Sequence, residues 1–266
     1  MSKCLFCGCQ TTSLTGAYEQ CGKCDIWISK VPAADYDDMY YYAKDFRTTD
    51  SLHRAGLLFD YFKQEIFGKK CLDFGCGDGS FVVTAKRNGT SIVGVDINKS
   101  LLAVASKSGE EGFYHSNELK SKFSCITSFD VIEHLGNLED YFKDVNRWLE
   151  PNGTLIITTP NKNSKWYSIF KEGWHGLGIP QYHRYVFSLS FLRQELARYG
   201  YSLEKSFSVP PISKSRWKLL VSSGYRLKKS TVHKLFSLPY IFCKFVYGKF
   251  HVKGEEDTLC LVARRL

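Results

Sequence analysis

The stretch that most constrains the fold is the glycine-rich sequence KCLDFGCGDGSF at residues 70–81. A short apolar run ends in Asp73, three glycines follow at alternate positions, and an amphipathic segment begins at Ser80. This order is typical of a buried parallel strand, a tight turn and the start of a helix. Glycines let a ligand approach the backbone closely, and the first turn of a helix presents unpaired N–H groups. The sequence therefore predicts a strand, turn and helix that together bind a ligand.

Strand-like and helix-like segments alternate from residue 69 onward. Strands are predicted at 70–74, 92–96, 112–115, 125–131, 154–159, 201–208 and 258–263, and helices near 79–88, 98–107, 138–149 and 189–199. This alternation predicts an α/β fold with a Rossmann-like, doubly wound, mostly parallel sheet that the last strand closes. The predicted domain covers residues 69–266 of the 266-residue chain.

The kind of ligand follows from how the turn departs from other glycine-rich turns. Ser80 stands where a dinucleotide-binding turn has its third glycine, and the second strand ends in Asp96, 21 residues after Gly75. An acid at that place accepts hydrogen bonds from ribose hydroxyls. The pattern resembles motif I of the class I S-adenosylmethionine (SAM) methyltransferases; a plain turn with a capping acid is the alternative. The resemblance implies that the cofactor-binding residues are Asp73, Gly75, Cys76, Gly77, Asp96, Ile97 and Phe129.

The first 30 residues carry a cysteine pattern of their own. Cys4-x2-Cys7 and Cys21-x2-Cys24 are separated by thirteen residues. Each pair supplies two thiolates from one turn, and tetrahedral zinc takes four such ligands. We therefore expect a small structural Cys4 zinc ribbon at residues 1–30, with Cys9 as a spare candidate if one of the four ligands is displaced. Scattered reduced thiols are the alternative, but such a short segment would then have almost no core.

Residues 31–68 are predicted to be a linker and leading helices. Asp50 and Ser51 can cap a helix whose apolar residues fall on one face. In the SAM enzymes that the chain resembles, such a helix covers the cofactor. Arg47, His53 and Arg54 are therefore candidates to reach the methionine carboxylate, or they are ordinary surface residues.

A second group of polar residues, Asp130, Glu133 and His134, follows the fourth predicted strand at the carboxyl edge of the sheet. The run Asp-x-x-Glu-His-Leu, followed by Leu-Glu-Pro-Asn-Gly and later Thr-Pro-Asn, resembles the ubiquinone-biosynthesis O-methyltransferases and related natural-product and glycan methyltransferases, over residues 50–205. By that resemblance, Asp130, Glu133 and His134 could hold magnesium that positions an acceptor hydroxyl. Without a metal, His134 could act as a general base, with Glu133 beside it. A polar turn that caps the next helix would give the same letters.

Aromatic and polar residues gather between residues 166 and 187, where this fold inserts elements that recognise the substrate. Two tryptophans and two histidines in a glycine-punctuated segment suit an apolar pocket with a few polar groups. His183 is the second candidate base. A lid that is merely packed by its aromatic residues is the alternative.

The basic residues are concentrated near the end of the chain. Residues 205–254 contain nine Lys, two Arg and no acid, more than the whole net charge of +9, together with many aromatic residues. Such a segment, inserted before the last strand, is typical of a helical element on an anionic membrane surface. It could equally be a subdomain with a cationic outer face, or it could bind RNA.

These features predict a SAM-dependent methyltransferase that acts on a hydroxyl of a small or lipid-linked acceptor, quinone-like or glycan. An RNA-binding protein or RNA methyltransferase, and a SAM-fold scaffold without activity, are the alternatives. Ten cysteines without a signal peptide, and no apolar run of membrane-spanning length, predict the cytoplasm, with attachment to the inner face of a membrane through the basic segment.

Overall fold

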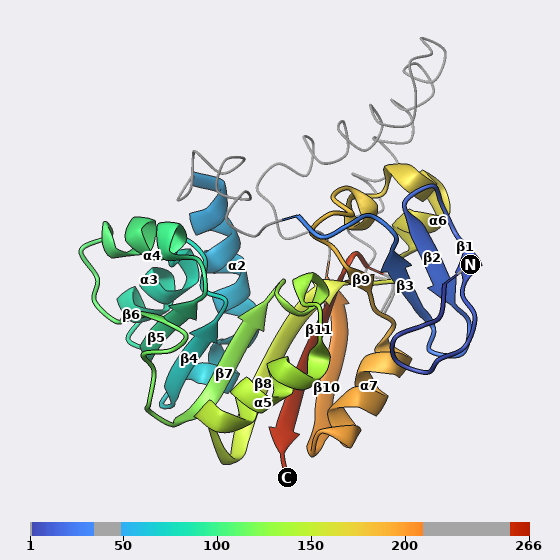
Figure 1. Cartoon of the computed structure of the whole chain (residues 1–266). Coiled ribbons are helices and arrows are strands. Elements are labelled where there is room, and N and C mark those ends of the chain that lie inside the picture. Colours follow the sequence, from blue (N-terminus) through green and yellow to red (C-terminus); the bar gives the residue numbers. More distant parts are fainter. Residues whose placement is uncertain (1, 35–48, 210–255) are drawn as a thin grey trace.

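The computed structural model describes residues 2–34, 49–209 and 256–266 (Figure 1). Arg47 lies outside these ranges. Of the basic segment expected at 205–254, residues 205–209 belong to a strand of the sheet and the remainder lies outside the described residues. In the described part of the chain, no helix is long and apolar enough to cross a membrane.

A seven-stranded sheet forms the centre of the molecule (Figure 1). In spatial order its strands are β10 (Tyr201–Val209), β11 (Thr258–Arg265), β8 (Leu149–Pro160), β7 (Phe123–Phe129), β4 (Lys70–Phe74), β5 (Ser91–Asp96) and β6 (Phe113–His115). The strands from β8 to β6 are parallel, whereas β11 is antiparallel to both of its neighbours. The expected mostly parallel, Rossmann-like sheet is confirmed. The strand latest in the chain lies inside the sheet, and β10 forms the edge.

Helices cover both faces of this sheet, because successive side chains of each strand point to opposite sides. Leu155 and Ile157 of β8 pack with α5 (Leu138–Trp148) and α7 (Leu189–Arg198). Ile156, between them, packs with α2 (Thr49–Ile66) and α3 (Ser80–Arg87). Helix α4 (Lys99–Ser106) lies against β5 and β6. Each of the three β8 side chains is fully buried, which stabilises the fold by about 1.5–3 kcal/mol per residue.

The N-terminal cysteine-containing unit shares a sheet with a distant part of the chain. Strands β1 (Thr12–Ser13), β2 (Tyr18–Cys21) and β3 (Ile26–Ser29) are antiparallel, and β9 (Tyr185–Val186) pairs with β3 as the fourth strand. Between β8 and β9 the chain forms α6 (Lys165–Phe170) and the short 3-10 turns η3 (Lys171–Gly173) and η4 (His175–Leu177). Trp27 of β3 packs with Trp166 and Trp174 of this segment. The unit expected at residues 1–30 is thus fastened to the segment in which an acceptor pocket is expected.

Candidate active site

The glycine turn after β4 has one crowded side and one open side. The N–H groups of Gly75 and Cys76 both donate to the carbonyl of Val95, at 2.8 and 3.0 Å, which fixes the turn against β5. Gly75 and Gly77 both adopt positive φ, +74° and +53°. A Cβ on Gly75 would lie 2.5 Å from Val131 Cγ2, whereas a Cβ on Gly77 would meet no described atom within 4 Å. Gly77 is therefore where a ligand can approach the backbone.

Asp96 connects the end of β5 to this turn. Its Oδ2 accepts a hydrogen bond from the Gly77 N–H at 2.9 Å, and its Oδ1 accepts one from the Asn98 N–H at 2.8 Å. Burial raises the pKa of Asp96 above its ordinary value, although these backbone donors oppose the shift. The next residue, Ile97, leaves 61% of its surface exposed beside the carboxylate. The end of β5 thus offers a polar acceptor and an apolar surface side by side.

Asp73 is the buried acid beneath the turn. It is 3% exposed, and its Oδ1 accepts a hydrogen bond of 2.7 Å from the Thr127 hydroxyl. Burial raises the pKa of Asp73 to about 7, and the hydrogen bond only partly offsets this. A cationic group bound nearby would favour ionisation of this carboxyl.

Two other residues expected to bind the cofactor are packed into the interior. The Cys76 side chain lies against Gly94, where a Cβ would come within 2.7 Å of its Sγ. Phe129 is 8% exposed and contacts the rings of Phe62 and Phe81, at centroid distances of 5.6 and 4.7 Å. Their side chains support the crevice from below, and the backbone of Cys76 remains part of the turn.

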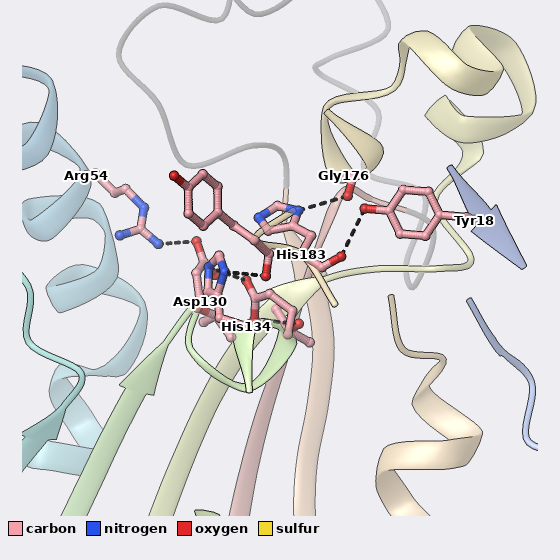
Figure 2. Close-up of polar contacts among 10 residues, drawn as sticks. Tyr18, Arg54, Asp130, His134, Gly176 and His183 are labelled. Carbon is pink, nitrogen blue, oxygen red and sulfur yellow. Dashed lines mark hydrogen bonds and ion pairs between the residues drawn. The ribbon is translucent and has the colours of Figure 1, made fainter. Parts of the chain in front are cut away.

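Asp130 forms an ion pair with Arg54 of α2, directly after β7 (Figure 2). Its backbone has the left-handed φ of +53°, and Thr158 Oγ1 donates to its Oδ1 at 2.8 Å. Burial alone would raise the pKa of Asp130, but the Arg54 charge and the Thr158 hydrogen bond outweigh it and lower that pKa. The carboxylate expected to hold magnesium is therefore neutralised by a guanidinium from the leading helix.

His134, in the 3-10 turn η2 (Ile132–His134), and His183, in the loop before β9, bring their rings together with centroids 4.9 Å apart (Figure 2). Nδ1 of His134 lies 3.0 Å from the Tyr182 carbonyl, and Nδ1 of His183 lies 2.9 Å from the Gly176 carbonyl. Because a carbonyl only accepts hydrogen bonds, we assign the proton of each neutral ring to Nδ1. Nε2 is then the nitrogen of each ring that can accept a proton or bind a metal.

Glu133 completes this cluster from beneath. It is fully buried, and its Oε2 accepts a 2.9 Å hydrogen bond from Thr159 Oγ1. Its Oε1 has no hydrogen-bond partner among the described residues and lies 4.0 Å from His134 Nε2. Burial raises the pKa of Glu133 well above its usual range and lowers that of His134. Both effects favour the neutral forms, including an imidazole ready to accept a proton.

Glu133, His134 and His183 each offer one ligand atom, and these atoms lie within 4.8 Å of one another. One carboxylate and two imidazoles suit transition metals and zinc, whereas magnesium prefers oxygen ligands. These residues could therefore hold a divalent metal, with His183 in the place where the sequence suggested Asp130. The same atoms could serve as proton acceptors.

Two features of the cluster were not anticipated. Arg54 contacts Asp130, and consecutive threonines at the end of β8, Thr158 and Thr159, donate to Asp130 and Glu133. The Thr-Thr-Pro sequence at the end of β8 could have predicted the two threonine contacts, because the neighbouring parallel strands β7 and β8 end at the same edge of the sheet. The Arg54 contact had no local signal, since it joins segments 76 residues apart.

The four predicted thiols gather as one group at the N-terminal unit. Cys4, Cys7, Cys21 and Cys24 each bring a ligand atom within 4.8 Å of the others. The Sγ atoms of Cys4 and Cys24 are 3.8 Å apart, and those of Cys7 and Cys21 are 3.5 Å apart. Sulfurs bound at about 2.3 Å around a tetrahedral ion would be separated by about 3.8 Å. The arrangement therefore fits a four-thiolate metal site and is too wide for disulfides.

Comparisons with known proteins place the chain among enzymes of one chemistry. Residues 46–206 match a family described as a methyltransferase domain. The ubiquinone biosynthesis O-methyltransferase of Actinobacillus pleuropneumoniae is 30% identical over 131 residues, which cover 42% of this chain and 56% of that protein. The protein of the same name from Coxiella burnetii is 31% identical over 119 residues, or 40% of this chain and 51% of that protein. The chain thus spans about half the length of these curated relatives.

The solved structures that resemble the chain share its fold. A SAM-dependent methyltransferase from Archaeoglobus fulgidus superposes with a TM-score of 0.55 at 17% identity, covering 87% of this chain and all of that one. A second, from Mesorhizobium loti, gives a TM-score of 0.52 at 16% identity and covers 80% of this chain and 98% of the other. This likeness agrees with the mostly parallel sheet and its helical layers.

Proposed function

The chain belongs to the methyltransferase-domain family, and on that basis we propose that it transfers a methyl group from SAM to a hydroxyl of a small or lipid-linked acceptor. One observation carries the proposal: the open glycine turn follows β4, and His134, which His183 joins from the loop before β9, follows the adjacent strand β7. Ligands of open α/β sheets bind outside the carboxyl ends of the strands. A nucleoside seat and two proton acceptors therefore share one edge of the sheet.

The cofactor would be held mainly by the ends of β4 and β5. Asp96 keeps lone pairs to accept ribose hydroxyl groups, and Ile97 offers an apolar surface to the adenine. The open backbone at Gly77 permits close approach, and Asp73 can pair with the methionine ammonium group. When bound, SAM supplies a methyl group that its sulfonium already activates.

The protein's remaining task is to align the acceptor and remove its proton. His134 and His183 each bring one ligand atom within 4.8 Å of the other and of Glu133, and burial favours the neutral form of His134. We assign the base to this pair, with Glu133 beside it. A divalent ion on Glu133, His134 and His183 is the second way to position an acceptor hydroxyl. It would occupy the same nitrogen atoms, so the two roles exclude each other.

The function is tested with SAM that carries a trideuterated methyl group, incubated with the protein and a metabolite and lipid extract. Mass spectrometry should find an acceptor that gains one labelled methyl group. Asp96→Ala should remove SAM binding in calorimetry, whereas His134→Gln should keep SAM binding and lose transfer. Lys143→Gln, at an exposed position of α5, is the control for His134→Gln. Unchanged SAM affinity of Asp96→Ala would contradict the cofactor assignment, and normal transfer by His134→Gln would contradict the base.

The same assay separates the base from the metal. If the imidazoles act as a base, a mild chelator that leaves one zinc per chain on the four thiolates, as elemental analysis verifies, leaves transfer unchanged. If they bind a metal, the chelator abolishes transfer, and added zinc or manganese restores it better than magnesium does.

We also propose that the four thiolates hold one structural zinc ion, which their sulfur separations support. Elemental analysis should find one zinc per chain. Cys24→Ser should lose it, while Cys9→Ser, in the same unit but outside the four-thiolate group, should keep it. Zinc well below one per chain in the wild type would end this assignment.

A further inference from the structure

Backbone and side-chain hydrogen bonds attach the N-terminal unit to the loop that carries His183. Tyr18 of β2 donates its hydroxyl proton to the His183 carbonyl at 3.1 Å (Figure 2). Ser29 of β3 donates from its N–H to the Arg184 carbonyl at 2.9 Å and from its hydroxyl to the Pro180 carbonyl at 2.7 Å. Both donors come from the hairpin formed by β2 and β3, and together they fix the loop on either side of His183.

The opposite side of the same loop is attached to the turn that carries His134. The Arg184 N–H donates to the Glu133 carbonyl at 2.7 Å, and the His134 ring approaches the Tyr182 carbonyl. The loop thus lies between the N-terminal hairpin and η2. The relative position of the two imidazoles depends on contacts from both sides.

The hairpin has little of its own to hold it in shape. Its strands are four residues each, so it depends on contacts with β1, β9 and the residues packed around Trp27, because a two-stranded hairpin alone is at best marginally stable in water. Cys21 ends β2, and Cys24 lies in the turn that leads to β3. A metal on these two residues and on Cys4 and Cys7 would close that turn covalently.

We propose that the four-cysteine metal site is a positioning element for the acceptor side of the active site. Metal binding orders the β2–β3 hairpin, which holds the loop at residues 179–187 and so places His183 against His134. The crevice formed by β4 and β5 has no part in these contacts and keeps its order without the metal. This inference rests on the proposed zinc site and on the proposed role of the imidazole pair.

Hydrogen–deuterium exchange on the full chain tests the coupling without an acceptor. Removing the metal with a chelator should speed exchange in residues 179–187, leave residues 70–96 unchanged, and leave the SAM Kd from calorimetry unchanged. Adding zinc should restore slow exchange. The proposal is overturned if residues 179–187 do not respond to metal, or if residues 70–96 lose protection with them.

A second variant keeps the metal and breaks one contact. Tyr18→Phe retains all four thiolates but loses the donor to the His183 carbonyl, so residues 179–187 should exchange roughly fivefold faster at full zinc content. Tyr114→Phe, a partly exposed tyrosine on β6, is the control and should change nothing there. Unchanged exchange in Tyr18→Phe would refute the proposed contact. A wild-type chain that fails to bind SAM would sink the proposed function, while the exchange result would stand on its own.

Discussion

SAM affinity should rise about fivefold between pH 6 and pH 7, because Asp73 has to lose a proton before it can pair with a cation. Burial raises the pKa of this carboxyl to about 7 in the ligand-free protein. If only the protein with ionised Asp73 binds SAM, the association constant is below its high-pH limit by a factor of about 11 at pH 6 and about 2 at pH 7. The SAM ammonium stays protonated in this window, since α-amino groups titrate near pH 8.

Isothermal titration calorimetry in two buffers with different protonation enthalpies measures the protons released on binding. A carboxyl with this pKa should release about 0.9 proton at pH 6 and about 0.5 at pH 7. Asp73→Asn has nearly the same shape but no titrating proton, so its release should vanish. Release that persists undiminished in this variant would contradict the assignment to Asp73. A wild-type Kd equal at both pH values, with heats independent of buffer, would refute the reasoning.

Four further substitutions test the packing of the site. Gly75→Ala should lower the free energy of unfolding by about 2–4 kcal/mol in urea titrations, because the new methyl group strains a left-handed backbone and collides with Val131. Gly77→Ala should lower it by only about 1–2 kcal/mol but should weaken SAM binding. Equal losses of stability in the two variants would contradict this distinction. Burial raises the pKa of Glu133, so the wild type loses stability as pH rises and this carboxyl ionises. With a chelator present, the Tm of Glu133→Gln should therefore match that of the wild type near pH 4 and exceed it at pH 8. A Tm of Glu133→Gln below that of the wild type at both pH values would show that the ionised form is needed. Trp174→Phe deletes an indole N–H that donates at 2.7 Å to the buried carboxylate of Asp257, directly before β11. The free energy of unfolding should fall by about 1.5–3 kcal/mol in guanidinium titrations. A loss below about 0.5 kcal/mol would mean that the Asp257 carboxylate finds another donor.

Local sequence patterns predicted the strands of the sheet and the helices that cover it, because apolar residues recur at regular intervals within each of these short segments. The same patterns anticipated the four-cysteine group, since two short spacings define it. Asp130 was expected beside Glu133 as a candidate magnesium ligand, and no local sequence pattern indicated the ion pair that the structure shows between Asp130 and Arg54. That contact, like the meeting of His183 with His134, joins segments far apart in sequence. Such contacts depend on the spatial order of the strands in the sheet, and local patterns of apolar residues do not predict that order.

Phe129 illustrates a limit of another kind. Its place at the end of a central strand indicated a cofactor-binding residue, and that role stays a prediction. The structure shows the ring packed with Phe62 and Phe81 on the side of α2 and α3. Which way a residue faces at the last position of a strand depends on the helices that cover that side, and these are known only once the layers are assembled.

The position of β11 between β8 and β10 has a consequence for biosynthesis. During translation β10 is made well before the strand that pairs with it, and β8 waits longer still for its antiparallel neighbour. Until β11 leaves the ribosome, two rows of unpaired backbone groups remain available to other chains. Chaperone dependence, and aggregation of nascent chains arrested before residue 258, should therefore concentrate at this edge.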